Sequence, residues 1–482
     1  MNTFNKKSLC VALAATGMLG AAGAVQAVNV SENGLGNVLI YPYYTVNKDV
    51  NGNYFNTLMS VVNTTASTKA IKVRFREGRN SLEVLDFNVF LSPFDVWTAA
   101  ITPGPVVNPG GGQGAGHIAT SDKSCTIPTF PANGVDFRTL TFESTDNGVS
   151  RTTEGYFEVF EMATYNDTSI TAVNSKHASG VPKNCSLVTD TTATLEQQPP
   201  QGGLFGNMVI LSPAGGGAFS QSATALANFS TVANYQTTGS DNPNYSDANP
   251  PISNVISGPF LFQSDWTGAG GPSPGDDAVA AVLLADRVTN EYVLDAGSKS
   301  QTTWIMTFPV KYAYVNSNPA FRPFTERYIT KVGACEPFFG VVFDREEASP
   351  QIITGTDFSP QPGPVAGPAL CWEAQSVGFG TSNVFGSSNH NNIATPFQNG
   401  WAVLGFNGVT TPDLHSMQPN GTSQVIDLRD GNVTTAQVTY FGLPVVGFAA
   451  ETFQNDAITV NGKTFLSTFG VTFPHHFGRV VQ

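Results

Sequence analysis

Charged side chains are scarce in this chain of 482 residues. Asp, Glu, Lys and Arg together make up 12% of the sequence, against about 25% in an ordinary soluble domain. A coiled coil needs far more charge, so that architecture is excluded. Acidic residues outnumber basic ones by 36 to 23, and the formal net charge is -13. Such a chain lacks the excess of Lys and Arg that binds a phosphate backbone, and we expect no nucleic-acid partner.

Long apolar runs are also absent after the beginning of the chain. The apolar run at residues 9–25 follows Lys6 and Lys7 and is closed by Ala27. A short basic segment, a short apolar core and a small final residue are typical of a secretory signal peptide, which we predict over residues 1–27. No later stretch offers about 18 uncharged apolar residues, so we expect no transmembrane helix. The predicted location is extracellular or at the cell surface, with the periplasm as the alternative.

Cysteine is rare, with 5 in the sequence. Cys10 lies in the predicted signal peptide, which leaves Cys125, Cys185, Cys335 and Cys371. An even number of cysteines in an exported chain favours disulfides. Several pairings are possible, and we favour Cys125 with Cys185 and Cys335 with Cys371, because each pair then joins residues of one half of the chain. The sequence has no CxxC spacing, which disfavours a zinc site.

Motifs of catalysis are weak. The 6 histidines form no HExxH motif, which a helical zinc site would need. Residues 271–275 match the GxSxG pattern around Ser273, but they lie in a Gly-rich segment, and Pro274 lacks the backbone N–H that an oxyanion hole would use. Glu154 and Glu158 share a face of a predicted strand, with a spacing that is not specific to glycoside hydrolysis. We therefore assign no catalytic residue and no cofactor.

One loop could hold calcium. Residues 240–247 read SDNPNYSD, and they could direct oxygen atoms of Asp241, Asn244 and Asp247 toward one Ca²⁺. The simpler interpretation, which we favour, is a solvated loop without a metal. These three residues are the metal-site candidates of the sequence.

Alternation with a period of two is abundant. Residues 69–77 (KAIKVRFRE) alternate apolar and basic side chains, and residues 82–91 return with Glu83 and Asp86 on their polar side. Such runs, separated by Gly, Pro and Asn, are typical of antiparallel strands. We expect the acids of the second run to pair with the bases of the first. The chain is therefore predicted to be all-β, with antiparallel β-sandwiches, long Gly-, Pro- and Asn-rich loops and few short helices.

The expected elements can be given by range. Residues 221–229 look helical, and a hairpin turn is expected at Thr289-Asn290. Further strands are expected at 137–144, 155–165, 207–211, 279–285, 291–294, 302–315, 338–343, 402–406, 436–441 and 457–460. Loops are expected at 102–116, 237–251, 266–277 and 359–368. We predict an N-terminal β-sandwich region with loop insertions over 28–325 and a C-terminal β-rich region over 326–482.

Stretches spread through the chain carry a resemblance. They are GLGNVLIYPYYTVN, SVVNTTASTKAIKVRFREGRNSLEVLDFNVFLSPFDVWTAA, SATALANF, NEYVLDAGSKSQTTWIMTFPVK and GLPVVGFAA. Together they resemble a group of exported, signal-peptide-bearing proteins of Gram-negative bacteria with no assigned activity. The resemblance implies export and no particular site residue.

The main functional hypothesis is an exported structural or interaction protein of the cell surface or extracellular matrix. Its partners would be other surface proteins or copies of itself, meeting through sheet edges or apolar patches. The alternative is a carbohydrate-binding or glycoside-cleaving β-sandwich protein with exposed Trp side chains. We expect Trp97 and Trp304 in the core, and Trp266, in a Gly-rich loop, as the exposed ligand candidate. A third hypothesis, an outer-membrane barrel, is disfavoured by the cysteine pairs and the Pro-rich loops.

Overall fold

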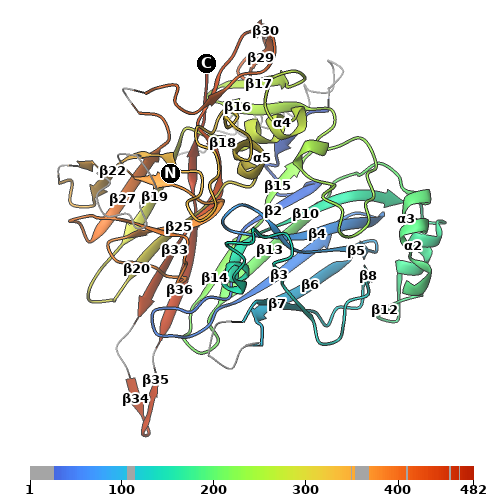
Figure 1. Ribbon diagram of the computed structural model, residues 1–482, viewed down its shortest axis with the longest axis horizontal. Helices are drawn as coiled ribbons and strands as arrows, with labels where there is room; N and C mark the ends of the chain where they lie inside the picture. Colours follow the sequence, from blue (N-terminus) through green and yellow to red (C-terminus); the bar gives the residue numbers. More distant parts are fainter. Residues whose placement is uncertain are drawn as a thin grey trace, which may run out of the picture.

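The structure is a computed structural model that describes residues 26–105, 114–348, 350–352, 368–408, 411–454, 458–465 and 467–482. Residues 1–25 of the predicted signal peptide, the centre of the predicted loop at 102–116 and nearly all of the one at 359–368 lie outside the described residues. The described chain is all-β, as expected, with antiparallel sheets and a few short helices. Figure 1 shows the N-terminal strands, in blue and green, beside the C-terminal strands, in yellow to red.

The N-terminal part is a sandwich of two sheets. Sheet N1 has the order β1 (Asn29–Val30), β15 (Thr224–Ala227), β2 (Val38–Thr45), β10 (Glu154–Tyr165), β4 (Thr68–Glu77), β5 (Glu83–Leu91) and β8 (Cys125–Ile127). Sheet N2 has the order β14 (Ala218–Ser222), β13 (Leu204–Leu211), β3 (Asn56–Asn63), β6 (Val96–Pro103), β7 (Gly116–Ala119) and β9 (Val135–Asp136).

Alternation explains the core of this sandwich. Val73 and Phe75 on β4 point away from the basic residues of the same strand and belong to one buried cluster with Trp97, Met208 and Ile210 of sheet N2. Strand β10 lies between β2 and β4, and all its residues are buried. Its central position is the one expected from aromatic residues on both of its faces.

The C-terminal part is a second sandwich. Sheet C1 has the order β23 (Gln351–Ile352), β22 (Phe339–Asp344), β27 (Asn399–Gly405), β19 (Arg287–Val293) and β37 (His476–Gly478). Sheet C2 has the order β26 (His390–Ile393), β25 (Ala374–Phe379), β20 (Gln301–Thr307), β33 (Val446–Gln454) and β36 (Thr468–Pro474), and β25 pairs with β26 in parallel. Sheet membership therefore changes between β15 and β16 (Ile252–Ser257), before residue 325.

The core between sheets C1 and C2 is aromatic. Tyr292 on β19 stacks on Phe379 of β25, with ring centroids 4.7 Å apart and ring planes 2° apart. Trp304 on β20 packs against the same Phe379 at 5.0 Å. Trp97 and Trp304 are both fully buried, which confirms the expectation that they lie in the core.

The two sandwiches share apolar clusters. Ile305 and Phe448, on the face of sheet C2 that points away from C1, belong to one cluster with Tyr43 and Phe219 of the N-terminal sandwich. On sheet N1, Ile40 belongs to a cluster with α4 (Pro274–Leu283). Sheets N1 and C2 are therefore covered on both faces, whereas N2 and C1 each turn one face to solvent.

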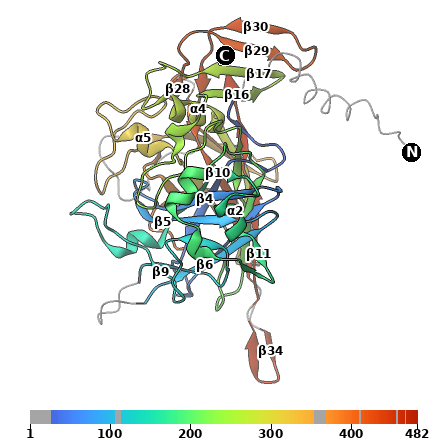
Figure 2. The same ribbon diagram turned by 90° about the vertical axis from the view of Figure 1, so that its right-hand side faces the viewer.

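A further sheet and a hairpin lie at opposite ends of the molecule. The sheet has the order β16, β17 (Phe260–Asp265), β29 (Ser423–Asp427) and β30 (Val433–Ala436). The hairpin consists of β34 (Ile458–Val460) and β35 (Lys463–Phe465) and projects beyond β33 and β36 (Figures 1 and 2). All four residues of the edge strand β30 are exposed.

Short elements complete the fold. The remaining strands are β11 (His177–Ala178), β12 (Val181–Pro182), β18 (Leu284–Ala285), β21 (Glu336–Pro337), β24 (Ala369–Leu370), β28 (Ser416–Met417), β31 (Tyr440–Phe441), β32 (Leu443–Pro444) and β38 (Val480–Val481). The other helices are α2 (Ile170–Ser175), α3 (Asp190–Glu196), α5 (Lys311–Val315), η1 (Val149–Thr153), η2 (Cys185–Leu187) and η3 (Tyr245–Asp247). Among the described residues, no helix is long and apolar enough to cross a membrane.

Two expectations based on local sequence patterns, one of a helix and one of a strand, are wrong. Residues 221–229 look helical, but they supply the end of β14 and all of β15, because pairing with β13 and β2 outweighs a short helical pattern. Residues 279–285, expected as a strand, mostly form α4. Ser273 accepts a hydrogen bond from the Asp276 N–H at 3.1 Å and caps this helix, and Pro274 lies in its first turn. The GxSxG match is therefore the start of a helix.

Three further expectations are wrong. The strand expected at 302–315 ends at Thr307, and α5 follows shortly after Pro309, which cannot donate to a strand ladder. Residues 137–144 form turns after the short strand β9. Thr289 and Asn290 lie inside β19, where they pair with Val403 and Ala402, and form no hairpin turn.

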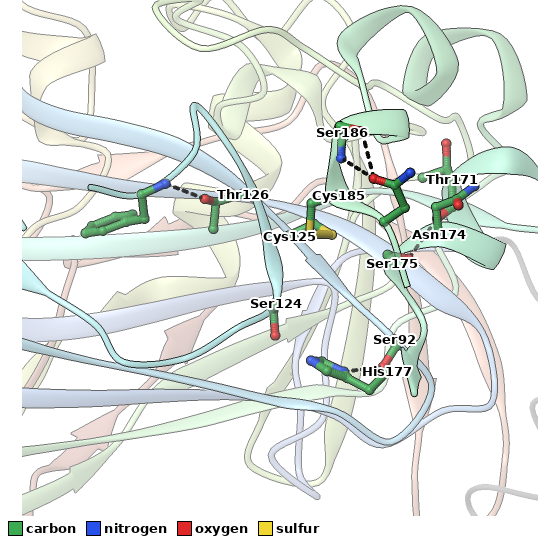
Figure 3. Close-up of a disulfide and its surroundings, with 12 residues drawn as sticks. Ser92, Ser124, Cys125, Thr126, Thr171, Asn174, Ser175, His177, Cys185 and Ser186 are labelled. Carbon is green, nitrogen blue, oxygen red and sulfur yellow. Dashed lines mark hydrogen bonds between the residues drawn. A yellow bond between two sulfur atoms is a disulfide. The ribbon is translucent and has the colours of Figure 1, made fainter. Parts of the chain in front are cut away.

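The two disulfides are the pairs favoured on the sequence. Cys125 bonds to Cys185, 60 residues apart, and Cys335 to Cys371, 36 residues apart. The first ties β8 to the segment that contains α2, η2 and α3 (Figure 3). His177 on the same segment reaches Ser92 through its Nδ1 at 3.1 Å, and the Tyr165 hydroxyl of β10 donates to the Ala193 carbonyl of α3 at 3.1 Å, so hydrogen bonds also hold this segment to sheet N1.

Candidate binding surface

The outer face of sheet C1 exposes an apolar surface. Phe343 and Trp401 lie opposite each other on β22 and β27. Their rings stack with centroids 4.0 Å apart and planes 6° apart. Trp401 is 42% exposed, Phe339 40% and Ile352 75%. We call this surface the aromatic face and define it as Phe339, Val341, Phe343, Ile352, Trp401 and Val403.

Strand alternation places these residues outside. In β27, Ala402 and Leu404 are fully buried, so Trp401 and Val403 point the other way. In β22, Val342 is buried and its neighbours in the strand face outward. The strand pairing brings the outward-facing residues of β22, β23 and β27 side by side. Val341 of β22 pairs with Val403 of β27 on one side and with Ile352 of β23 on the other.

Charged residues border the aromatic face. Glu291 on β19 lies directly across from Trp401 and is exposed. Arg345 and Glu346, which follow β22, form an ion pair at 2.6 Å with both side chains about two-thirds exposed. An apolar centre with a charged border is the arrangement found in protein interfaces.

Trp266, the ligand candidate of the sequence, is not at this surface. Its side chain is fully buried, and its indole N–H donates to Ser253 Oγ at 2.8 Å. The ring packs against Tyr440, with centroids 5.3 Å apart. The expectation of exposure is therefore wrong, because the Gly-rich segment after Trp266 folds back and β31 closes over the ring. Trp401, inside a strand, is the exposed tryptophan that takes its place.

The calcium candidates serve the local turn. Asn244 Oδ1 accepts from the Ser246 N–H at 2.8 Å, and Asp247 Oδ2 accepts from the Asn244 N–H at 2.9 Å. Asp241 contributes its carbonyl to the Asn244 side chain at 3.2 Å. In the part of the chain that the structure describes, no three His, Cys, Asp or Glu side chains are grouped so as to hold a metal ion.

The loop that contains the calcium candidates contacts the ammonium group of a lysine. The Lys72 ammonium donates to the carbonyls of Thr237, Ser240 and Asn242 at 2.8–3.1 Å. Its pKa is lowered, chiefly by burial, although Asp86 at 3.0 Å opposes this shift. The loop therefore covers the basic row of β4.

Ion pairs across strands account for that basic row. Arg74 contacts Glu83 at 2.9 Å, and Lys72 contacts Asp86. The acids lie on β5, as expected from the sequence. Both cations have side chains without exposed surface, so the row is an internal network and no open anion-binding stripe.

The carboxylates of β10 are occupied by partners. Glu158 pairs with Arg76 at 3.0 Å. Glu154 accepts from the Tyr43 hydroxyl at 2.6 Å and from the Ser388 hydroxyl at 2.6 Å. The two carboxylates therefore connect neighbouring segments, and Glu154 joins the N-terminal sandwich to the C-terminal one.

Several buried acids have raised pKa values. Burial raises the pKa of Glu373 to about 8 and that of Glu451 to about 7. Asp276 and Asp277, at the start of α4, are raised to about 6 by burial. Glu373 accepts from Ser81 and from the Tyr312 N–H. All four acids are buried, so their raised pKa values first affect the stability of the fold.

Comparisons of the chain with protein-family models, with curated proteins and with solved structures found no match. The resemblance to exported Gram-negative proteins therefore stays a prediction. Function is inferred from the geometry of this chain alone.

Proposed function

We propose that the chain is an exported structural or interaction protein of the cell surface, and that it associates with copies of itself through the aromatic face. The observation that carries the proposal is the pair of exposed rings of Phe339 and Trp401, with the half-buried Phe343 stacked on Trp401, on two neighbouring strands. Contiguous apolar patches mark interaction sites. Aromatic residues are enriched at the centres of protein interfaces.

A second copy fits this surface because a sheet face can meet its own equivalent around a two-fold axis. Two sheets packed face to face lie about 10 Å apart, a gap that aromatic side chains from both sides fill. The low charge of the chain, 12%, reduces the cost of removing this face from water. The two disulfides are compatible with an oxidising compartment outside the cytoplasm.

Size exclusion with light scattering tests the proposal. We expect the chain from residue 28 onward to show a mass of two or more copies, and the double variant Phe339→Ser/Trp401→Ser to show the mass of one. The matched control is Leu58→Ser/Val96→Ser, which removes two side chains of similar exposure, 39% and 45%, from the outer face of sheet N2. The control should assemble like the unaltered protein. A mass of one copy for the unaltered protein would contradict self-association.

A second candidate function is carbohydrate binding by the same face. The observation that favours it is the exposed Trp401 ring beside the polar Glu291. We expect Trp401→Ala to abolish binding on a panel of polysaccharides, and the Leu58→Ser/Val96→Ser control to retain it. If no polysaccharide binds to the unaltered protein, this candidate is wrong.

A further inference from the structure

A cavity of about 110 Å³ lies where the two sandwiches meet. Its wall combines Arg79, from the turn between β4 and β5, with residues of the C-terminal half: Lys331, Trp372, Ser388 and His390. Cys371 of the second disulfide also lines it. Ligand sites occur preferentially at such junctions between structural units.

Arg79 lines the cavity, and one amino group of its guanidinium donates no hydrogen bond to a described residue. Its Nη1 contacts both carboxylate oxygens of Asp146 at 3.2 Å, and its Nε donates to Asn389 Oδ1 at 3.4 Å. Its Nη2 has no acceptor among the described residues. The guanidinium carbon lies 5.3 Å from the ring centroid of Trp372, so the cation and the indole ring form adjoining parts of the wall.

Lys331 supplies a second positive charge. It lies in a tight turn closed by hydrogen bonds in both directions between Ile329 and Gly333, at 3.1 and 2.8 Å. Its φ of 68° holds the residue in the left-handed region. The side chain is exposed, and no acceptor contacts its ammonium group in the part of the chain described.

The other polar residues of the wall are tied to the protein. His390 uses Nδ1 toward Ser376 Oγ at 2.7 Å and Nε2 toward Asn392 Oδ1 at 2.9 Å. Burial lowers its pKa, so the ring is neutral at pH 7. Ser388 donates its hydroxyl to Glu154. Asn391 also lines the cavity and donates from Nδ2 to the Ala369 carbonyl at 3.3 Å, so the positively charged groups left for a ligand are Arg79 and Lys331.

Among the described residues, no carboxylate side chain lines the cavity, although the whole chain carries a formal charge of -13. The nearest acids are already paired. Asp146 is shared by Arg79 and Arg151, each at 3.2 Å. Glu154 is 2% exposed and accepts from Tyr43 and Ser388. A negatively charged ligand would find donors here and no facing acid.

We propose that this cavity binds the carboxylate of an acidic sugar, with Arg79 and Lys331 as its donors and Trp372 beside the sugar ring. A water molecule occupies about 30 Å³ in the liquid, so the cavity has room for a carboxylate and part of the ring that bears it. Charge-assisted hydrogen bonds to carboxylates are the strong ones in proteins. The flat, partly exposed indole is an apolar surface of the size of a pyranose ring. The cavity lies apart from the aromatic face, so this inference does not depend on the proposed function.

Titration calorimetry with glucuronate tests the proposal on the full chain from residue 28. We expect saturable binding, weaker binding at high salt because the ions screen the charges, and no comparable binding of uncharged glucose. Lys331→Gln should weaken glucuronate binding by about tenfold, since one charge-assisted hydrogen bond is lost. Glutamine is one atom shorter than lysine and, like lysine, is not branched at Cβ, so the variant should fold like the unaltered protein.

Lys123→Gln is the matched control, because Lys123 is also an exposed lysine and does not line the cavity. It should bind glucuronate with unchanged affinity. Trp372→Leu should bring the affinity for glucuronate close to that for acetate, which offers the carboxylate without a sugar ring. Equal affinities of the unaltered protein for acetate, inorganic phosphate and glucuronate would overturn the assignment to an acidic sugar. Absent glucuronate binding, or equal weakening by Lys331→Gln and Lys123→Gln, would overturn the site itself.

Discussion

Arg76 of sheet N1 and Tyr312 of α5 face each other across the junction of the two sandwiches, with the guanidinium carbon 4.6 Å from the ring centroid. The same side chain donates to the Tyr312 hydroxyl at 3.4 Å and pairs with Glu158 at 3.0 Å. A buried charge pair of the first sandwich is therefore enclosed by a helix from the second part of the chain. The two parts are expected to unfold together, because separating them would expose this pair.

Replacement of Arg76 should be costly. Arg76→Ala leaves the Glu158 carboxylate buried without its cation, and we expect the free energy of unfolding to fall by about 3–5 kcal/mol. Urea denaturation measures this change. The control is Arg429→Ala, which removes an arginine that is 67% exposed from its pair with Asp427 and should leave the urea midpoint unchanged. Equal effects of the two variants would show that burial of the Arg76 pair is not what matters.

Replacement of Trp266 and replacement of Trp401 should affect the stability of the protein differently. Trp266→Ala empties a fully buried site and leaves Ser253 without its donor, so we expect a loss of about 3–5 kcal/mol. Trp401→Ala removes a partly exposed ring, so the loss should be under about 1.5 kcal/mol, the upper value of a stacked aromatic pair. Thermal unfolding of both variants measures the difference. If Trp401→Ala is the more destabilising, the assignment of Trp401 to a binding surface is wrong.

Most of the correct predictions about strands came from the alternation of apolar and polar residues. It predicted β4 and β5 and ion pairing between the acids of β5 and the bases of β4, because cross-strand partners in a hairpin are close in sequence. Aromatic residues on both faces of residues 155–165 predicted a central strand, and β10 lies between β2 and β4. The even number of cysteines predicted two disulfides, and the position of two cysteines in each half of the chain favoured the pairs that form.

Long-range packing decided what could not be predicted. Trp266 sits in a Gly-rich segment, but Tyr440, far along the chain, covers it. Residues 221–229 become strands because β13 and β2 offer ladder partners that a local pattern does not contain. The cavity joins Arg79 to Trp372 and Lys331, and no motif links residues so far apart.

The first disulfide should contribute to stability through the loop that it closes. Cys125 and Cys185 are 60 residues apart, and a cross-link over such a loop contributes roughly 4 kcal/mol in the chain-entropy model. We expect Cys125→Ser/Cys185→Ser to lower the melting temperature. It should also increase hydrogen exchange first in α2 and α3, because this segment loses its covalent attachment to β8 and keeps only noncovalent contacts with sheet N1. Unchanged exchange there would contradict the idea that the disulfide holds the segment on sheet N1.

Glu451 should make the stability depend on pH. Burial and the nearby Glu291 raise its pKa from 4.5 to about 7, so the folded state binds more protons than the unfolded state between these values. The free energy of unfolding should therefore fall as the pH rises from about 4.5 through 7, by on the order of 1–3 kcal/mol for this group.

Glu451→Gln keeps an acceptor for the Thr302 hydroxyl and removes the ionisation. Relative to the unaltered protein, we expect this variant to be more stable at pH 8 and about equal at pH 4, as measured by urea midpoints across that range. Glu161→Gln is the contrasting control. It disrupts the fully buried contact with Lys69, so it should destabilise the protein at pH 8, where Glu451→Gln stabilises it. A constant difference between Glu451→Gln and the unaltered protein at all pH values would show that Glu451 does not titrate in this range.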